Sequence, residues 1–66
     1  MISRDIASDY LNGCVQGTDP QEALQEALNA HLKLWTDEEK ADIYAYIVEN
    51  EGAAPIADVI HKALNR

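Results

Sequence analysis

The sequence has a single cysteine, Cys14, and no phenylalanine. One cysteine cannot form a disulfide within the chain, so stability must come from apolar packing, and a reducing compartment fits this usage. No apolar run reaches the roughly 20 residues that a membrane-spanning helix needs. The opening letters, MISRDIASDYL, lack the basic and then apolar pattern of a signal peptide. We therefore expect a cytoplasmic protein.

Basic residues are also scarce. Five Lys and Arg stand against twelve Asp and Glu, which gives a formal net charge of −7. Binding to nucleic acids and to anionic membranes depends largely on basic side chains, so we expect neither as a direct partner. An acidic chain is instead steered toward basic proteins.

The length of the chain allows one domain, over residues 1–66. A chain this short buries only about 60% of the surface that its unfolded form exposes. Its hydrophobic share of 47% is enough for one small core, made mainly of Ala, Leu, Ile and Val, so the chain is not predicted to be disordered. Folding alone is marginal at this size, and a dimer would help.

Two stretches carry the residue types that begin helices. In TDPQEA, Asp19 can cap a helix and Pro20 can take its first position, where the missing N–H costs nothing. In TDEE, Thr36 and Glu39 have the spacing of a capping box, in which each side chain accepts the backbone N–H of the other residue. The sequence thus predicts helices that begin after Asp19 and after Thr36.

Glycine and proline mark the other boundaries. Gly52 can end a helix in the left-handed conformation, and Pro55 can open the next helix. Ser3 is a weaker cap for the first segment. Gly13 leaves two interpretations: the first helix stops just before it, or the helix continues through it and Gly17 is the stop. We favour the second. An interior glycine costs roughly 1 kcal/mol against Ala, and this cost would be offset if the glycine lets two helices approach closely.

Apolar residues recur at helical spacing between these boundaries, and nothing alternates with the period of a strand. The predicted stripes are Ile6, Tyr10, Leu11, Cys14 and Val15; Leu24, Leu28, His31, Leu32 and Trp35; Ile43, Tyr44, Ile47 and Val48; and Ile56, Val59, Ile60, Ala63 and Leu64. The predicted fold is therefore all-α, a compact bundle of four short helices at about 3–16, 20–35, 37–51 and 55–65.

The segment from Trp35 onward resembles the first part of a Myb or SANT repeat. The resemblance is carried by Trp-Thr-x-Glu-Glu at 35–39, Ile43, Ile47, Gly52 and Ile56-Ala57. It implies a helix-turn-helix variant that binds DNA through a basic third helix, so a DNA-binding regulator is one alternative function. The helix opened by Pro55 offers Asp58, His61, Lys62 and Asn65 outward, which is not the Arg-rich set that reads base edges, and no DNA-contacting residue is carried over.

Few residues suit catalysis or metal binding. Cys14 and His31 both lie on apolar stripes, which indicates a small hydrophobe and a residue at the boundary of the core. His61 faces outward, and no Cys or His pair has metal-ligand spacing. Because no acid, base and nucleophile converge, we expect no enzymatic activity, no cofactor and no metal.

Acidic residues form a more informative pattern. Three pairs at i, i+4 are found in the first three predicted helices: Asp5 and Asp9, Glu22 and Glu26, and Glu38 and Asp42. Like charges at this spacing oppose helix formation by a few tenths of a kcal/mol. The helix dipole explains the first member of each pair, and the second is either a solubilising charge or part of an acidic docking face.

The third predicted helix carries the sharpest candidate. Asp42, Tyr46 and Glu49 follow i, i+4, i+7 on the side away from Ile43 and Ile47. Tyr46 would then stand exposed between carboxylates, as an interface anchor would. The alternative is that Tyr46 covers the edge of the core.

These observations predict a non-enzymatic module that binds a basic protein surface, one that itself can bind nucleic acid. The expected binding residues are Glu22, Glu26, Glu38, Asp42, Tyr46 and Glu49. By analogy, small acidic proteins of this kind include phage-encoded inhibitors of host machinery such as anti-CRISPRs. The other alternative is a structural module that pairs with a second copy of the chain through Ile56, Val59, Ile60 and Leu64.

Overall fold

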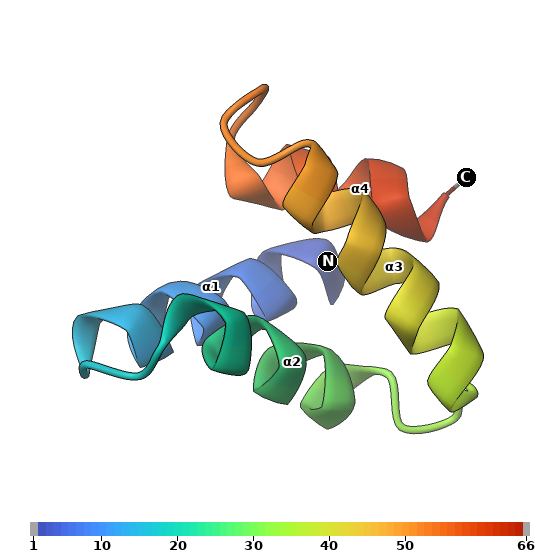
Figure 1. Cartoon of the computed structure of the whole chain (residues 1–66), viewed down its shortest axis with the longest axis horizontal. Helices are drawn as coiled ribbons and strands as arrows, with labels where there is room; N and C mark the ends of the chain where they lie inside the picture. The colour runs from blue at the N-terminus through green and yellow to red at the C-terminus, as the bar shows by residue number, and fades with distance from the viewer. Residues whose placement is uncertain (1, 66) are drawn as a thin grey trace.

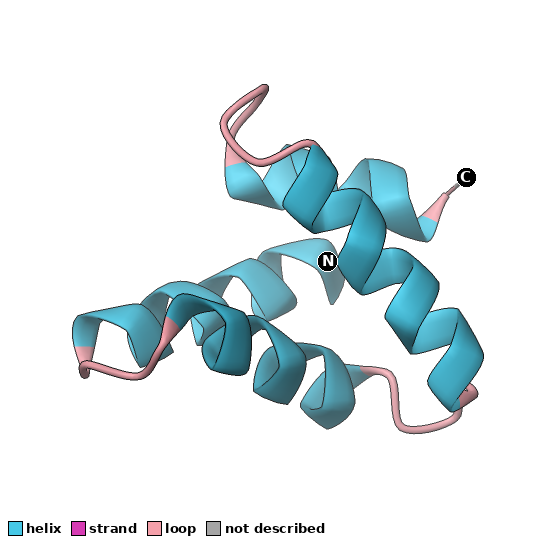
Figure 2. Ribbon diagram, viewed as in Figure 1, coloured by secondary structure: helices cyan, strands magenta, loops and turns pink. Residues whose placement is uncertain are grey.

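The computed structural model describes residues 2–65, which form four helices joined by loops (Figures 1 and 2). The helices are α1 (Ile2–Val15), α2 (Pro20–His31), α3 (Asp37–Glu49) and α4 (Ile56–Leu64). Within the described residues, the extended pairing is limited to an isolated bridge between Glu51 and Ala54 in the last loop. The prediction of an all-α bundle of four short helices is confirmed.

The helices form a ring around one core. α1 packs along α2 and also against α4, while α3 packs against α4 and α2. α1 and α2 make an antiparallel hairpin, and α3 and α4 lie across its open end (Figure 1). Each helix therefore has two neighbours and turns its apolar side to the middle of the ring.

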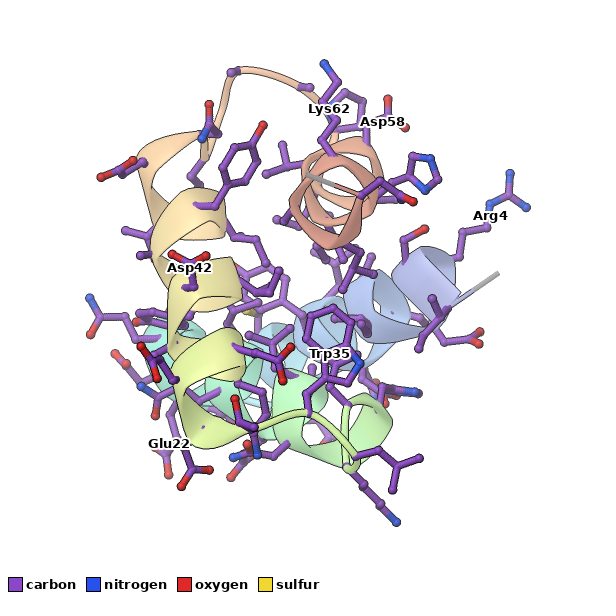
Figure 3. The ribbon with its side chains drawn as sticks, turned by 90° about the vertical axis from the view of Figure 1, so that its right-hand side faces the viewer. Arg4, Glu22, Trp35, Asp42, Asp58 and Lys62 are labelled. Carbon is purple, nitrogen blue, oxygen red and sulfur yellow. The ribbon has the colours of Figure 1, made fainter. Side chains whose placement is uncertain are left out.

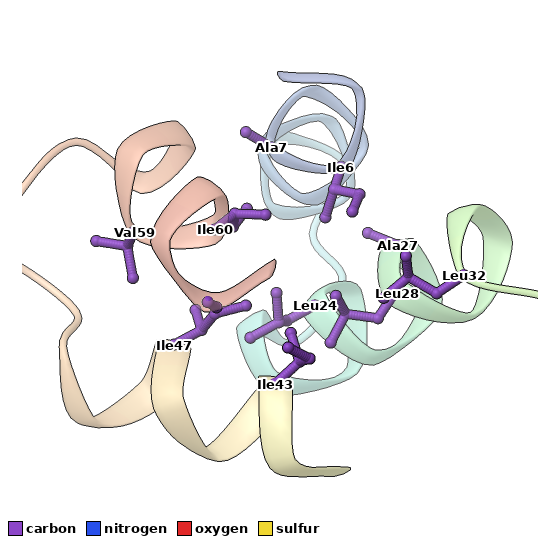
Figure 4. Close-up of a cluster of buried hydrophobic side chains, with 11 residues drawn as sticks. Ile6, Ala7, Leu24, Ala27, Leu28, Leu32, Ile43, Ile47, Val59 and Ile60 are labelled. Atoms are coloured by element: carbon purple, nitrogen blue, oxygen red, sulfur yellow. The ribbon is translucent and has the colours of Figure 1, made fainter. Parts of the chain in front are cut away.

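Buried side chains from all four helices meet inside this ring (Figure 4). Ile6 of α1 and Ile60 of α4 are completely buried, and Leu28 of α2 and Ile47 of α3 are nearly so. The rest of the buried cluster is Ala7, Leu24, Ala27, Leu32, Ile43, Val59 and Ala63. All of them except Ala7 and Ala27 belong to the stripes that the helical spacing predicted.

Three other stripe residues are exposed, so the prediction is wrong for Leu11, Val15 and Val48. Leu11 and Val15 lie five and nine residues after Ile6, which turns them away from the buried side of α1, and Val48 lies one position off the side that Ile47 buries.

Turn residues separate the helices in the way their chemistry predicts. Gly17 and Gly52 have φ angles of +94° and +87°, in the left-handed region that residues with a side chain rarely adopt. Pro20 occupies the start of α2, with Asp19 at the N-cap although its side chain makes no capping bond. Pro55 is itself the N-cap of α4 and lies just before the first helical position.

α2 ends at His31, earlier than the predicted boundary at Trp35. Leu32 is buried and caps the helix, and the Trp35 N–H then donates to the Leu32 carbonyl at 3.1 Å in a tight turn. The next helix begins soon afterwards, because Thr36 is extended and caps α3. Leu34, at the tip of the turn, is fully exposed.

Ser3 lies inside α1 and does not cap it, so that expectation is wrong. Its side chain is completely buried, and its hydroxyl oxygen has no hydrogen-bond partner among the described residues. A buried hydroxyl without a partner costs free energy because it has lost its bonds to water.

Gly13 lies within α1, as predicted, at a place where α1 and α2 approach closely. A Cβ atom added at Gly13 would lie 3.1 Å from the Cβ of Ala23. The two helices thus touch through their smallest residues, and a larger side chain at either position would push them apart.

We expect Ser3→Ala to raise the free energy of unfolding by about 1 kcal/mol, because it removes the buried hydroxyl that lacks a partner. Urea denaturation measures the change. Ser8→Ala is the matched control, since Ser8 is an exposed serine of the same helix and reports the helix propensity gain alone, about 0.5 kcal/mol. A Ser3→Ala variant less stable than Ser8→Ala would contradict the prediction.

We expect Gly13→Val to lower the free energy of unfolding by about 1–3 kcal/mol through overpacking against Ala23. The exposed Ser8→Val substitution introduces the same branched side chain into α1 without a neighbouring helix, and should be nearly neutral. Thermal unfolding followed by circular dichroism compares the two variants. Equal melting temperatures would show that the α1–α2 contact at Gly13 is not tight.

Candidate functional site

The outer side of α3 carries an acidic hollow. Thr36, Glu38, Glu39, Ala41, Asp42 and Ala45 line this open hollow of about 610 Å³. Ala41 and Ala45 form a low floor, and the longer carboxylate side chains stand around it. Three negative charges thus line one hollow. We call the surface around it the α3 face: Glu38, Glu39, Asp42, Ala41 and Ala45 line the hollow, and the exposed Glu49 lies two helical turns beyond Asp42 on the same side of α3.

Local capping chemistry fixes the start of this surface. The Thr36 Oγ1 atom accepts the Glu39 N–H at 3.1 Å, and the Glu39 Oε1 atom accepts the Thr36 N–H at 2.9 Å. The predicted capping box is therefore confirmed. Asp37, Glu38 and Glu39 all lie in the first turn, where the positive end of the helix dipole stabilises negative charge.

The one lysine of α3 does not neutralise the α3 face. Lys40 points to the groove between α2 and α3, where its Nζ donates to the Asn29 Oδ1 at 3.1 Å and lies 3.6 Å from the Asp37 Oδ1. In Figure 3, the cations Arg4 and Lys62 lie on α1 and α4, apart from Asp42 on α3. The residues that line the α3 hollow include no Lys or Arg.

Tyr46 is less exposed than predicted. Its side chain is half-buried and packs against the core cluster, so the expectation that it stands outside the core between carboxylates is wrong. Helical geometry explains the difference, because a large ring next to Ile47 reaches the gap between α3 and its neighbours. The alternative interpretation, that Tyr46 covers the edge of the core, describes its position.

The structure does not gather the predicted binding residues on one surface. Glu38 and Asp42 line the α3 hollow, and Glu49 is exposed further along the same helix. Glu26 instead lines a hollow between α1 and α2, of about 270 Å³, together with Asp9. Glu22 is exposed on α2 and lines neither hollow. The α2 residues are therefore not part of the α3 face.

An unexpected contact explains one of the acidic pairs. The Asp9 carboxylate is hydrogen-bonded to the Nε2 atom of His31, which joins α1 to α2. Asp9 therefore has a structural partner that helical spacing within α1 could not indicate. His31 is half-buried, at the boundary of the core as predicted.

The other candidates for chemistry lie apart from one another. Cys14 is a half-buried free thiol on α1. His61 is exposed on α4, and its backbone carbonyl accepts a hydrogen bond from the Asn65 side-chain amide at 2.8 Å. Among residues 2–65, no three His, Cys, Asp or Glu side chains are grouped as a metal ion would need. Over the same residues, no helix is both long and apolar enough to cross a membrane.

Tyr10 has the one clearly perturbed ionisation in the described part of the chain. Burial raises the pKa of its hydroxyl above the ordinary value, and the nearby Cys14 and Glu51 raise it further. Tyr10 packs against the core and lines a narrow hollow that includes Pro20 and Ile56. Its neutral form thus belongs to the packing of α1 against α4 and the loop that contains Glu51.

A second hollow beside the α3 face was not predicted from the sequence. Trp35, Glu39, Asp42, Ile43, Ala63 and Leu64 line a space of about 280 Å³ between the start of α3 and the end of α4. We call it the Trp35 hollow. The position of Trp35 immediately before a capping box is the part of this hollow that the sequence could indicate. Ala63 and Leu64 line the hollow only because α4 packs against α3 in the tertiary fold.

Comparisons of the chain with protein-family models, with curated proteins and with solved structures give no match. The resemblance of the segment from Trp35 onward to a Myb or SANT repeat therefore rests on its motif alone.

We expect Tyr10→Phe to remove the tyrosine that ionises at the highest pH in a near-ultraviolet absorbance titration. Because the folded pKa lies above the unfolded value of about 10, the neutral hydroxyl stabilises the fold below that pH, and this contribution is lost as the pH rises through the folded pKa. A late step that persists in Tyr10→Phe would contradict the assignment.

Proposed function

We propose that the protein is a non-enzymatic module that docks its α3 face on a basic surface of another protein. The observation that carries this proposal is the composition of the hollow: Glu38, Glu39 and Asp42 line it, and the nearby cation Lys40 is turned toward α2. A partner with Lys or Arg side chains would find no competing cation among the residues that line it.

The energetic cost of Glu49 also supports the proposal. Glu49 is the last residue of α3, a helix with no basic residue in its final turn. The negative end of the helix dipole disfavours an anion there by a few tenths of a kcal/mol. Glu51 follows two residues later and adds to the negative charge at this end of α3. Folding gains nothing from Glu49, whereas an acidic docking surface would.

Charge and shape suit this partner in different ways. Complementary charge mainly raises the association rate and selects the partner. The low floor at Ala41 and Ala45 would let long basic side chains lie along α3, with their apolar stems on the alanines and their charges at the carboxylates.

A basic surface that normally holds nucleic acid is the partner class that this chemistry favours. Carboxylates on the α3 face would compete with phosphates for the same Lys and Arg side chains. We therefore propose a modulator or inhibitor of a nucleic-acid-binding protein, the role that small phage-encoded proteins such as anti-CRISPRs have.

The arrangement of α4 gives less support to the two alternative functions, a DNA-binding regulator and a module that pairs with a second copy of the chain. As a DNA-reading helix it would present Asp58 together with His61 and Lys62, and phosphates would repel the carboxylate. As a pairing face for a second copy it would need Val59 and Ile60, which are already buried in the core of the chain.

We expect the Glu38→Lys, Asp42→Lys, Glu49→Lys variant to bind an amidated nine-lysine peptide at least about tenfold more weakly than the wild type at low salt, since three lost ion pairs of about 0.5 kcal/mol each give this factor. Calorimetric titration at two salt concentrations measures it. Far-ultraviolet circular dichroism confirms that each variant is folded.

The matched control is the Asp5→Lys, Asp19→Lys, Asp58→Lys variant, which changes the net charge equally with exposed residues outside α3. It should keep most of the affinity. Equal losses in the two variants would show that only net charge matters and would reject the α3 face as a site. Tight binding of the wild type to a DNA duplex that weakens steeply with salt would favour the DNA-binding alternative instead.

A further inference from the structure

The Trp35 hollow combines an aromatic ring with two carboxylates. Its inner wall is apolar, from the Trp35 ring, Ile43, Ala63 and Leu64, and its acidic residues are Glu39 and Asp42. The same two acidic residues also line the α3 hollow, so the two hollows share one edge. A partner seated on the α3 face would lie directly beside the Trp35 ring.

The groups of this hollow are held in place by the fold. Trp35 is half-buried against the core, and its backbone N–H donates to the Leu32 backbone carbonyl. Glu39 is bonded to the backbone of Thr36 through the capping box. Ala63 is almost completely buried and lines the hollow with a small side chain. The hollow therefore does not have to be ordered by its occupant, which lowers the cost of binding.

The chemistry of the lining selects a cation with an apolar and planar character. A cation above the face of an indole is attracted by the ring quadrupole, and Trp is the best of the aromatic residues for this contact. A guanidinium can stack on the ring and at the same time donate to a carboxylate with its fork of N–H groups. An ammonium is more strongly hydrated and makes no stacked contact, so arginine fits this lining better than lysine.

We propose that the Trp35 hollow receives an arginine side chain of the basic partner, stacked on Trp35 and bonded to Glu39 and Asp42. This inference rests on the proposed function and names the residue type that anchors the partner. It does not require either carboxylate to be unengaged, because an ionised carboxylate has about four lone-pair sites. The capping bond of Glu39 uses one of them.

Trp35 reports on the hollow directly, because it is the single tryptophan of the chain. The probes are amidated peptides of nine arginines and of nine lysines, titrated into the full chain at low salt. We expect the arginine peptide to change the Trp35 fluorescence saturably and to bind roughly fivefold more tightly than the lysine peptide, as a cation–π contact of about 1 kcal/mol predicts.

Two substitutions test the residues of the hollow by calorimetry. Trp35→Leu should reduce the ratio of the arginine-peptide affinity to the lysine-peptide affinity to nearly one. Asp42→Asn should weaken the binding of the arginine peptide more than that of the lysine peptide. Asp58→Asn is the matched control, since it removes one carboxylate from an exposed position on α4, and it should leave the preference unchanged. If Trp35→Leu does not fold, the comparison of Asp42→Asn with Asp58→Asn alone tests the arginine site.

The outcomes separate this inference from the proposed function. If both peptides bind equally, with Trp35 fluorescence unchanged, while the reversal of Glu38, Asp42 and Glu49 still weakens both, the arginine site is rejected and the α3 face stands. If the Glu38→Lys, Asp42→Lys, Glu49→Lys variant loses no more peptide affinity than the Asp5→Lys, Asp19→Lys, Asp58→Lys control, the proposed function itself fails. An arginine preference that Asp42→Asn alters no more than Asp58→Asn would also reject the arginine site.

Discussion

Burial of apolar side chains from all four helices in one small core is the constraint on which the whole structure depends. Sixty-six residues with one cysteine have no covalent link to offset the entropy lost on folding, so each helix must turn its apolar side inward. Ile6, Leu28, Ile47 and Ile60, one from each helix, occupy the centre. Because most apolar side chains meet inside the ring, the charged side chains lie outside, and most of these are acidic.

The acidic surface that results has separate causes at separate positions. Asp37, Glu38 and Glu39 are stabilised by the start of α3, and Asp9 by its bond to His31. These carboxylates contribute to the fold whether or not they have any further role. Glu49 has no such structural reason, and the α3 face is where a partner would account for it.

Sequence reasoning succeeded where the physics is local. The capping box of Thr36 and Glu39 and the left-handed Gly17 and Gly52 each depend on neighbours within a few positions, and the structure has all of them. The stripes of aliphatic residues are correct for most of the core, although Leu11, Val15 and Val48 are exposed. The continuation of α1 through Gly13 was also predicted, although its neighbour Ala23 was not.

The failures concern features that depend on how the helices meet. The end of α2 at His31 is set by the turn that brings Leu32 into the core, and no glycine or proline marks it. The half-buried Tyr46 and the bond between Asp9 and His31 depend on the packing of one helix against another. The Trp35 hollow needs α4 beside α3, which helical spacing within one segment cannot reveal.

The ring arrangement also has a consequence for how the chain folds. The α1–α2 hairpin joins neighbouring segments, whereas the contact of α4 with α1 joins the two most distant helices of the chain. Closing that long loop costs the most entropy, yet only this step covers Ile6 with Ile60. The hairpin alone would leave Ile6 facing water, so the four helices are expected to gain and lose their order together, as one cooperative unit.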